Sequence, residues 1–225
     1  MTLSPVGDVA VNVSFGSTVD EVTLAQVRSF AQSLADQRLA GVVDVLPAFA
    51  SVTVYYDITE LVSYADFCVQ LERRLRETAV GTVAANARSV LIPVCYEDPD
   101  FGPDLSLVAR HCGLSPAEVI RQHVQPDYAV HAIGFSPGFA YLGGLLNTLH
   151  TPRQATPRTR VAAGSVGIGG GQTGVYPRAT PGGWNLIGRT PVAFFDFERR
   201  EAAWLKTGDR VRFHVISREQ YDAWK

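Results

Sequence analysis

The fold of the second half of this chain is decided by HAIGFSPGFAYLGGL (131–145), TPRQATPRTRVAAGSVGIGGGQTGVYP (151–177) and ATPGGWNLIGRTP (179–191). Glycine and proline are too frequent here for long helices, because glycine is conformationally free and proline lacks the amide hydrogen that a helix needs. Polar and aromatic side chains stand between them. Such a composition is typical of loops that place polar groups at the rim of a pocket.

Short apolar and β-branched runs predict strands around these segments, over residues 127–133, 160–168, 192–197 and 210–216. Ser115 and Pro116 form an N-cap followed by a proline at the first helical position, which predicts a short helix that ends at His123. A last helical turn is expected over 219–224. A closed or nearly closed β-barrel is the simplest architecture for this half.

The first part of the chain alternates strand and helix patterns. Strands are predicted over residues 9–15, 42–46, 51–56 and 90–96, and helices over 18–40 and from Ser63 onward. Thr18 and Glu21 are expected to form a capping box. The order β-α-β-β-α-β is typical of a ferredoxin-like α+β domain. We expect residues 82–88, which are small and polar, to link it to the barrel.

Composition excludes several classes of protein. The chain has 225 residues, 46% of them hydrophobic, and a formal net charge of −2, so bulk attraction to nucleic acid or an anionic membrane is not expected. Its three cysteines form no C-x-x-C motif, which argues against a disulfide framework or a zinc site. The N-terminal sequence lacks the features of a secretory signal. We therefore expect a cytoplasmic protein.

Two familiar motifs fail on their context. Gly169, Gly171 and Gly174 satisfy the spelling G-x-G-x-x-G, but the prolines that follow cannot supply the helix that a dinucleotide site needs. Ser136 lies in a sequence close to G-x-S-x-G, yet Pro137 has no N–H to donate to an oxyanion. No P-loop sequence is present, so any use of ATP would not employ a P-loop on this chain.

Some polar residues are better candidates for a site. His131 ends a predicted strand just before a glycine-rich turn, where an imidazole could exchange a proton near pH 7; it could equally be hydrogen-bonded within the barrel wall. Arg158 and Arg160 could clamp an anion, or could belong to a solvated loop. Gln172 and Thr173 follow three glycines, where a backbone can approach a ligand closely.

Aromatic side chains occur throughout the same segments. They would wall a pocket, although they could also cap one end of the barrel or pack against a partner. These residues are Phe135, Phe139, Tyr141, Tyr176 and Trp184.

Several long blocks together resemble the family of B-type subunits of 5-oxoprolinase, also called the KipI or allophanate hydrolase subunit 1 family. The blocks are GFSPGFAYL (134–142), TPRTRV (156–161), AGSV (163–166), GGQTGVYP (170–177), PGGW (181–184) and IGRTP (187–191). Their number and order are more specific than any single short motif.

The resemblance implies an α+β fold: a ferredoxin-like domain over residues 1–84, then a cyclophilin-like β-barrel over 85–225 that carries the site. It implies one component of a heteromeric hydrolase, inactive alone, which opens 5-oxoproline to glutamate at the expense of ATP. The partners would be a protein of the C-type subunit or allophanate hydrolase subunit 2 type, and an A-type subunit. No metal and no biotin attachment are expected on this chain.

The same resemblance suggests roles at the site. His131 and Gln172 would hold and polarise the lactam, with Thr173 and the amides of Gly169, Gly170 and Gly171 as oxyanion or phosphate donors. Arg158 or Arg160 would clamp an anion. The remaining substrate-binding residues would be Phe135, Ser136, Gly138, Phe139, Tyr141, Tyr176 and Trp184.

Two alternatives stay open within the family. One is carboxyl transfer from carboxybiotin to urea, as in a urea carboxylase or allophanate hydrolase system, with biotin carried by another protein. The other is a KipI-like inhibitor that binds a sensor histidine kinase, in which case the aromatic surface would be a docking face.

Overall fold

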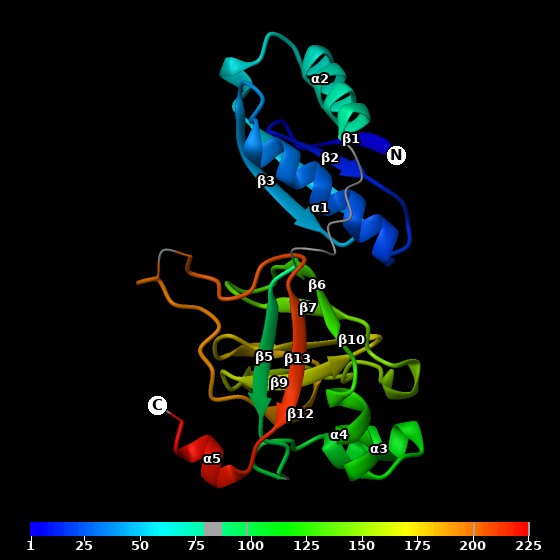
Figure 1. Cartoon of the computed structure of the whole chain (residues 1–225), viewed down its shortest axis with the longest axis vertical. Helices are drawn as coiled ribbons and strands as arrows, with labels where there is room; N and C mark the ends of the chain where they lie inside the picture. Colours follow the sequence, from blue (N-terminus) through cyan, green and yellow to red (C-terminus); the bar gives the residue numbers. More distant parts are fainter. Residues whose placement is uncertain (79–86, 98, 200, 225) are drawn as a thin grey trace. The chain divides into compact units, whose positions relative to one another are not determined.

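The computed structural model describes residues 1–78, 87–97, 99–199 and 201–224. Contacts within the chain separate it into two compact units, residues 1–87 and 88–225 (Figure 1). The boundary expected between residues 84 and 85, and most of the linker predicted over 82–88, lie outside the described residues. The fold is mixed α/β, with mostly antiparallel strands and few helices.

The first unit is a four-stranded antiparallel sheet with two helices. Its elements are β1 (Thr2–Val6), β2 (Ala10–Ser14), α1 (Glu21–Asp36), β3 (Val42–Ala48), β4 (Ser51–Tyr56), the 3-10 turn η1 (Ile58–Glu60) and α2 (Tyr64–Glu77). The strand order is β1-β2-β4-β3. Alternate residues of β4 are buried, and Val52 and Val54 share one core with Phe30 of α1 and Phe67 of α2. Burial of that core against both helices holds the unit together.

The two helix starts of this unit differ in how well their sequence motifs predict them. Ser63 caps α2 as expected, since its hydroxyl accepts a hydrogen bond from the Asp66 N–H at 3.0 Å. The prediction that Thr18 and Glu21 form a capping box is wrong. Helix α1 begins after Asp20, whose carboxylate accepts from the Thr23 N–H at 2.8 Å, because aspartate is at least as good an N-cap as threonine.

The strand predicted over 90–96 is present, but it does not belong to the first unit. It is β5 (Ser89–Val94), which pairs in parallel with β13 (Arg210–Val215). The edge beside β2 is taken instead by β1, which was not predicted. Pro5 weakens the strand signal of this segment, and it is tolerated because an edge strand has amide positions without a partner strand.

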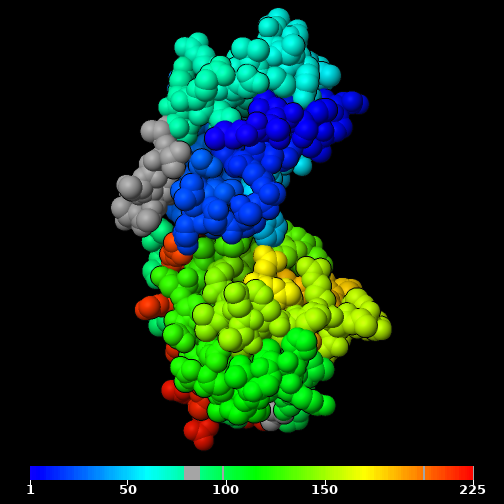
Figure 2. All heavy atoms as spheres, turned by 90° about the vertical axis from the view of Figure 1, so that its right-hand side faces the viewer, coloured from blue at the N-terminus to red at the C-terminus, as the bar shows by residue number. Residues whose placement is uncertain are grey.

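The second unit contains the remaining elements. These are β5, α3 (Leu105–Cys112), α4 (Pro116–Val124), β6 (Tyr128–Ile133), β7 (Ala140–Gly143), η3 (Asn147–Leu149), β8 (Arg158–Val161), β9 (Ser165–Gly169), β10 (Gln172–Val175), β11 (Thr180–Gly182), β12 (Asn185–Arg189), β13 and α5 (Arg218–Asp222). Figure 1 shows β5 and β13 side by side along this unit. Figure 2 shows the side where α3, α4 and the segment after them, in green, form much of the surface.

Strand pairing in this unit forms a ring. The order β5-β13-β6-β7-β10-β9-β12 is continuous, and it returns to β5 through a bridge between Cys95 and Arg189. Each residue of that bridge donates its N–H to the carbonyl of the other at 2.8 Å. The inner face carries the larger apolar core, which includes Ile92, Leu142 and Ile168. Strands β8 and β11 form a separate two-stranded sheet.

Several predicted elements of this half differ from the structure. The strand predicted over 160–168 is divided into β8 and β9, because the chain turns at Gly164, where φ is +81°. Residues 192–197 form no strand and contribute a single bridge between Phe195 and Ala203. Helix α4 is capped by Ser115 as predicted. No helix among the described residues is both long and apolar enough to cross a membrane.

Candidate functional site

The five aromatic side chains predicted for the site lie together in one cluster. They are Phe135 and Phe139 from the loop after β6, Tyr141 from β7, Tyr176 after β10 and Trp184 before β12. The Phe139 ring is central, with centroids 4.9 to 5.4 Å from the other four. Edge-to-face pairs of this kind contribute about 0.5–1.5 kcal/mol each beyond burial. Phe139 and Trp184 are buried, whereas Phe135 is 61% exposed at the edge of the cluster.

Glycines form the floor beneath these rings. A Cβ added to Gly169 would lie 2.4 Å from the Trp184 indole nitrogen, and one added to Gly182 would lie 2.4 Å from the Tyr176 hydroxyl. At Gly174 it would meet both Phe139 and Trp184 at 3.2 Å. The glycines are needed because bulky rings occupy the volume that their own side chains would fill.

His131 and Gln172 lie on the same face of the sheet, which we call the outer face because it points away from the inside of the ring of strands. His131 lies at a bulge in β6, and its ring covers Gly143 of β7, where an added Cβ would lie 1.7 Å from the imidazole. Thr173 of β10 pairs with Leu142, so the same register places Gln172 opposite Gly143. Directly opposed residues of an antiparallel pair point to the same face, which brings the imidazole and the amide side by side. Both residues are partly buried.

Thr173 points the other way, into the ring of strands. Its hydroxyl is fully buried, donates to the Gly167 carbonyl at 2.9 Å and contacts His123 Nε2 at 2.9 Å. The hydroxyl of Tyr96 lies 2.8 Å from the other nitrogen, Nδ1. Because the single Thr173 proton goes to Gly167, Nε2 carries the imidazole proton and Tyr96 donates to Nδ1. This geometry gives Thr173 a place in the core, without contact with the aromatic face.

His123 is therefore a core histidine. Burial lowers its pKa to about 3, since a charged imidazole would lose its hydration without gaining a counter-ion. Its ring stacks on Phe213 with centroids 4.6 Å apart. The neutral ring ties α4 to β10.

The glycine amides predicted as donors are in part already used. Gly170 has φ of +66° at the β9–β10 turn, and its N–H donates to the Thr151 carbonyl at 2.8 Å. A Cβ on Gly171 would lie 2.9 Å from the His150 ring. Gly169 is required by Trp184, as described above. The geometry explains these three glycines by packing and turn formation, and the Gly170 amide is not available to a ligand.

The two predicted arginines differ. Arg158 Nη2 donates to Asp104 Oδ1 at 2.7 Å, and Asp104 Oδ2 accepts from the Leu186 N–H at 2.7 Å. Arg158 is thus an ion-paired, partly buried side chain and not a residue of a solvated loop. Arg160 is exposed. Asp104 was not predicted, because an isolated aspartate before a short helix gives no signal of such a contact.

The turn that carries Ser136 and Gly138 is unusual. Phe135 has φ of +68°, and the Ser136 N–H donates to the Gly134 carbonyl at 2.8 Å, which forms a γ-turn with a strained central residue. The Ser136 hydroxyl oxygen is buried and meets no hydrogen-bond partner among the residues that the structure describes. Gly138 has φ of +83° and approaches Phe195 closely. The turn holds the Phe135 ring at the exposed edge of the cluster.

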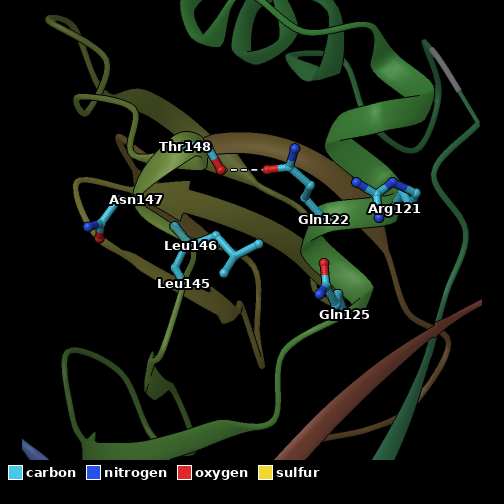
Figure 3. A pocket seen from close by; sticks show the side chains of 7 residues that line it. All are labelled: Arg121, Gln122, Gln125, Leu145, Leu146, Asn147 and Thr148. Atoms are coloured by element: carbon cyan, nitrogen blue, oxygen red, sulfur yellow. Dashed lines mark hydrogen bonds between the residues drawn. The ribbon is translucent and has the colours of Figure 1, made fainter.

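A separate pocket lies between α4 and the segment before η3 (Figure 3). It has a volume of about 510 Å³, and a hydrogen bond of 2.5 Å from Thr148 to Gln122 crosses it. Its lining residues are Arg121, Gln122, Gln125, Leu145, Leu146, Asn147 and Thr148. The residues predicted for the site lie elsewhere. Within the described part of the chain, no three metal-ligating side chains come together.

The fold and sequence define a class of protein. Residues 1–205 match the family model of the carboxyltransferase domain, subdomain C and D. In solved structures, TTHA0988 superposes with a TM-score of 0.81 and 36% identity, over 92% of this chain and 40% of that one. The chain therefore spans less than half of TTHA0988. The Kluyveromyces lactis urea amidolyase has the same fold, with a TM-score of 0.78 at 19% identity over 98% of this chain and 15% of that one.

Curated relatives match over nearly their whole length. A Bacillus subtilis protein, named as the B-type subunit of 5-oxoprolinase, is 41% identical over 99% of this chain and 96% of its own. The protein of the same name from Escherichia coli O157:H7 is 43% identical over 92% of this chain and 93% of its own. The chain belongs to the family of B-type subunits of 5-oxoprolinase.

Proposed function

We propose that this chain is one component of an ATP-dependent 5-oxoprolinase, which opens 5-oxo-L-proline to L-glutamate together with an A-type and a C-type subunit. The observation that carries the proposal is the identity of 40–43%, over nearly the full length, with three curated proteins named as B-type subunits of 5-oxoprolinase. Such a name implies a complex, so ATP would be used by the assembly and the chain would be inactive alone. Its place would be the cytoplasm.

The chemistry explains why such a complex would consume ATP. A lactam resists attack by water because amide resonance must be lost. Transfer of the γ-phosphoryl group of ATP to the lactam oxygen, with release of ADP, would turn that oxygen into a leaving group. Water then adds to the carbon, and the ring C–N bond breaks with its nitrogen taking a proton, which leaves an acyl phosphate. A second water attacks this acyl phosphate, and free phosphate departs as the carboxylate of glutamate forms.

The outer face of the sheet offers groups for two of these steps. The Gln172 amide would donate a hydrogen bond to the lactam oxygen, and the His131 imidazole would take a proton from water. Both are supported by their position beside the aromatic cluster, with the imidazole over Gly143 and Gln172 opposite it in the strand register. The cluster would pack against the apolar ring of the substrate. The Thr173 hydroxyl is bonded in the core and does not contact this face, so we assign it no role in the reaction.

The test is to purify the chain with its A-type and C-type partners and to measure ADP and glutamate. ADP release should require 5-oxoproline and match glutamate formation. ATP turnover that ignores 5-oxoproline would contradict the proposal. His131→Ala and Gln172→Ala should lower kcat roughly a hundredfold while the complex still forms. His111→Ala and Gln70→Ala, at exposed positions on α3 and α2, are matched controls that should keep full activity.

If either variant at the outer face instead prevents assembly, its residue belongs to the interface between the components. Carboxyl transfer to urea is supported by the match to the carboxyltransferase domain family and by the fold shared with the Kluyveromyces lactis urea amidolyase, at 19% identity. The kinase-inhibitor alternative has no specific observation in its favour.

We also propose the finer description of the fold, a ferredoxin-like domain up to about residue 84 and a cyclophilin-like barrel from residue 85. The order β2-β4-β3 with two helices supports the first, with β1 in place of the usual fourth strand. The ring of strands completed at Cys95 and Arg189 supports the second.

A further inference from the structure

The guanidinium of Arg158 is fixed on one side and unsatisfied on the other. Nη2 donates to Asp104, but Nη1 is buried and meets no hydrogen-bond partner within the described ranges of the chain. Asp104 cannot turn to reach it, because its second oxygen is held by the Leu186 N–H at 2.7 Å. A buried charged donor without an acceptor is costly. The side chain is thus positioned by the protein for an acceptor that comes from elsewhere.

This donor lies near the aromatic cluster. Arg158 of β8 pairs with Gly182 of β11, and the Tyr176 hydroxyl covers Gly182. Burial raises the pKa of Tyr176, while a hydrogen bond from the Trp184 backbone and, with smaller effect, the charges of Arg153 and Arg158 act in the opposite direction. Both arginines are therefore close enough to the Tyr176 hydroxyl for their charges to act on it.

Arg153 is held in place by the cluster itself. Its guanidinium carbon lies 5.9 Å from the centroid of the Trp184 ring, within the range of a cation–π contact. It is exposed, so its charge faces solvent beside the same rings. Because Asp104 already neutralises Arg158, Arg153 supplies the net positive charge of this group.

The surrounding sequence carries no negative charge of its own. The chain has 22 acidic residues, yet none of them falls between residues 128 and 195. The same stretch holds five arginines, at positions 153, 158, 160, 178 and 189. Asp104, from outside this stretch, pairs with Arg158. An anion would meet attraction here with little competing repulsion.

We propose that Arg158, Arg153 and the Tyr176 hydroxyl form a subsite for a small anion, either a carboxylate or a phosphoryl group. Arg158 Nη1 and the Tyr176 O–H would donate to its oxygens, and Arg153 would add charge from the Trp184 side. Its assignment to the reaction rests on the proposed function, since 5-oxoproline has one carboxylate and its activated form would have a phosphoryl group.

The test is calorimetric titration of the full chain with 5-oxo-L-proline, with 2-pyrrolidinone, which is the same lactam without the carboxylate, and with inorganic phosphate. Arg158→Lys keeps the charge beside Asp104 but removes the second nitrogen. It and Tyr176→Phe should each weaken anion binding roughly tenfold. Arg153→Gln should weaken it up to about fivefold, as for an exposed charge. Arg178→Gln, exposed on the same segment, is the matched control and should bind as the unaltered chain does.

Binding of 5-oxoproline without binding of 2-pyrrolidinone would identify the carboxylate, and binding of phosphate alone would identify the phosphoryl group. The proposal is overturned if neither anion binds, or if Tyr176→Phe and Arg153→Gln bind like Arg178→Gln. Tyr176→Phe remains informative if Arg158→Lys does not fold. Anion binding by the isolated chain together with a complex that ignores 5-oxoproline would sink the proposed function and leave the subsite standing.

Discussion

The inner and outer faces of one strand, β10, are built on opposite principles. On the inner face, Thr173 and His123 are fully buried, and their polar atoms are paired within the protein. On the outer face, Gln172 is partly buried beside His131, and the neighbouring positions are glycines covered by aromatic rings. Chemistry-bearing side chains that are neighbours in sequence can therefore have unrelated tasks, because a strand points them apart.

The packing of the outer face can be tested by adding a methyl group to one of the glycines beneath its aromatic rings. Gly169→Ala places a methyl group 2.4 Å from the Trp184 indole nitrogen, so the ring must shift. Overpacking of this kind costs about 3 kcal/mol in the free energy of unfolding. Gly183→Ala is the control, since its nearest neighbour would lie at an ordinary 3.6 Å. Urea denaturation measures both; equal stability of the two variants would contradict the packing described for Trp184.

The inner face can be broken by removing one hydroxyl. Thr173→Val keeps the shape of the side chain but leaves the Nε2–H of His123 and the Gly167 carbonyl without their partner. We expect a loss of about 2 kcal/mol in the free energy of unfolding, from two unsatisfied buried groups. The same measurement on Gln172→Ala should give a much smaller loss, because its side chain is only partly buried. Similar losses for the two variants would erase the contrast between the faces.

The inner face should also make the free energy of unfolding depend on pH, through His123. The pKa of His123 is lowered from 6.5 to about 3, so the folded state binds fewer protons than the unfolded state below pH 6.5. Stability is therefore complete above pH 6.5 and falls toward pH 3. Between pH 7 and pH 5, above the usual carboxyl range, the loss from this group is about 2 kcal/mol. Chemical denaturation across that range should show a flatter profile for His123→Gln; an unchanged slope would contradict the assignment.

A smaller change is expected at the strained turn on the edge of the outer face. Phe135→Ala and Phe135→Gly both remove the ring, but only glycine adopts a φ of +68° without strain. The glycine variant should therefore be more stable than the alanine variant by about 1 kcal/mol in thermal unfolding. If alanine equals glycine here, the backbone at this residue is not strained.

Sequence patterns predicted much of this structure and for identifiable reasons. Ser63 and Ser115 cap helices where the motif places them, because capping is local. The position of β5 could not be predicted in this way, since its partner β13 follows more than a hundred residues later. The aromatic residues that lie together in the structure could be picked out from the sequence because they stand in glycine-rich segments.

The remaining site residues show where such reasoning stops. Thr173 could have been set apart from Gln172, because alternation along a strand sends neighbours to opposite faces. Asp104 gave no signal, since its contact with Arg158 joins residues from distant segments. The bulge that brings His131 over Gly143 is a property of the paired strands, and neither strand alone encodes it.

The bridge between Cys95 and Arg189 has a consequence for how the second unit comes apart. Every other neighbouring pair in the ring is joined by a ladder, whereas β5 and β12 meet through the two hydrogen bonds of this bridge. Thermal fluctuations should therefore separate β5 from β12 more readily than any other neighbouring pair of strands. The amide hydrogens of Cys95 and Arg189 should then exchange with heavy water earlier than those inside the ladders. The ring of strands is in this sense a rolled sheet with a seam.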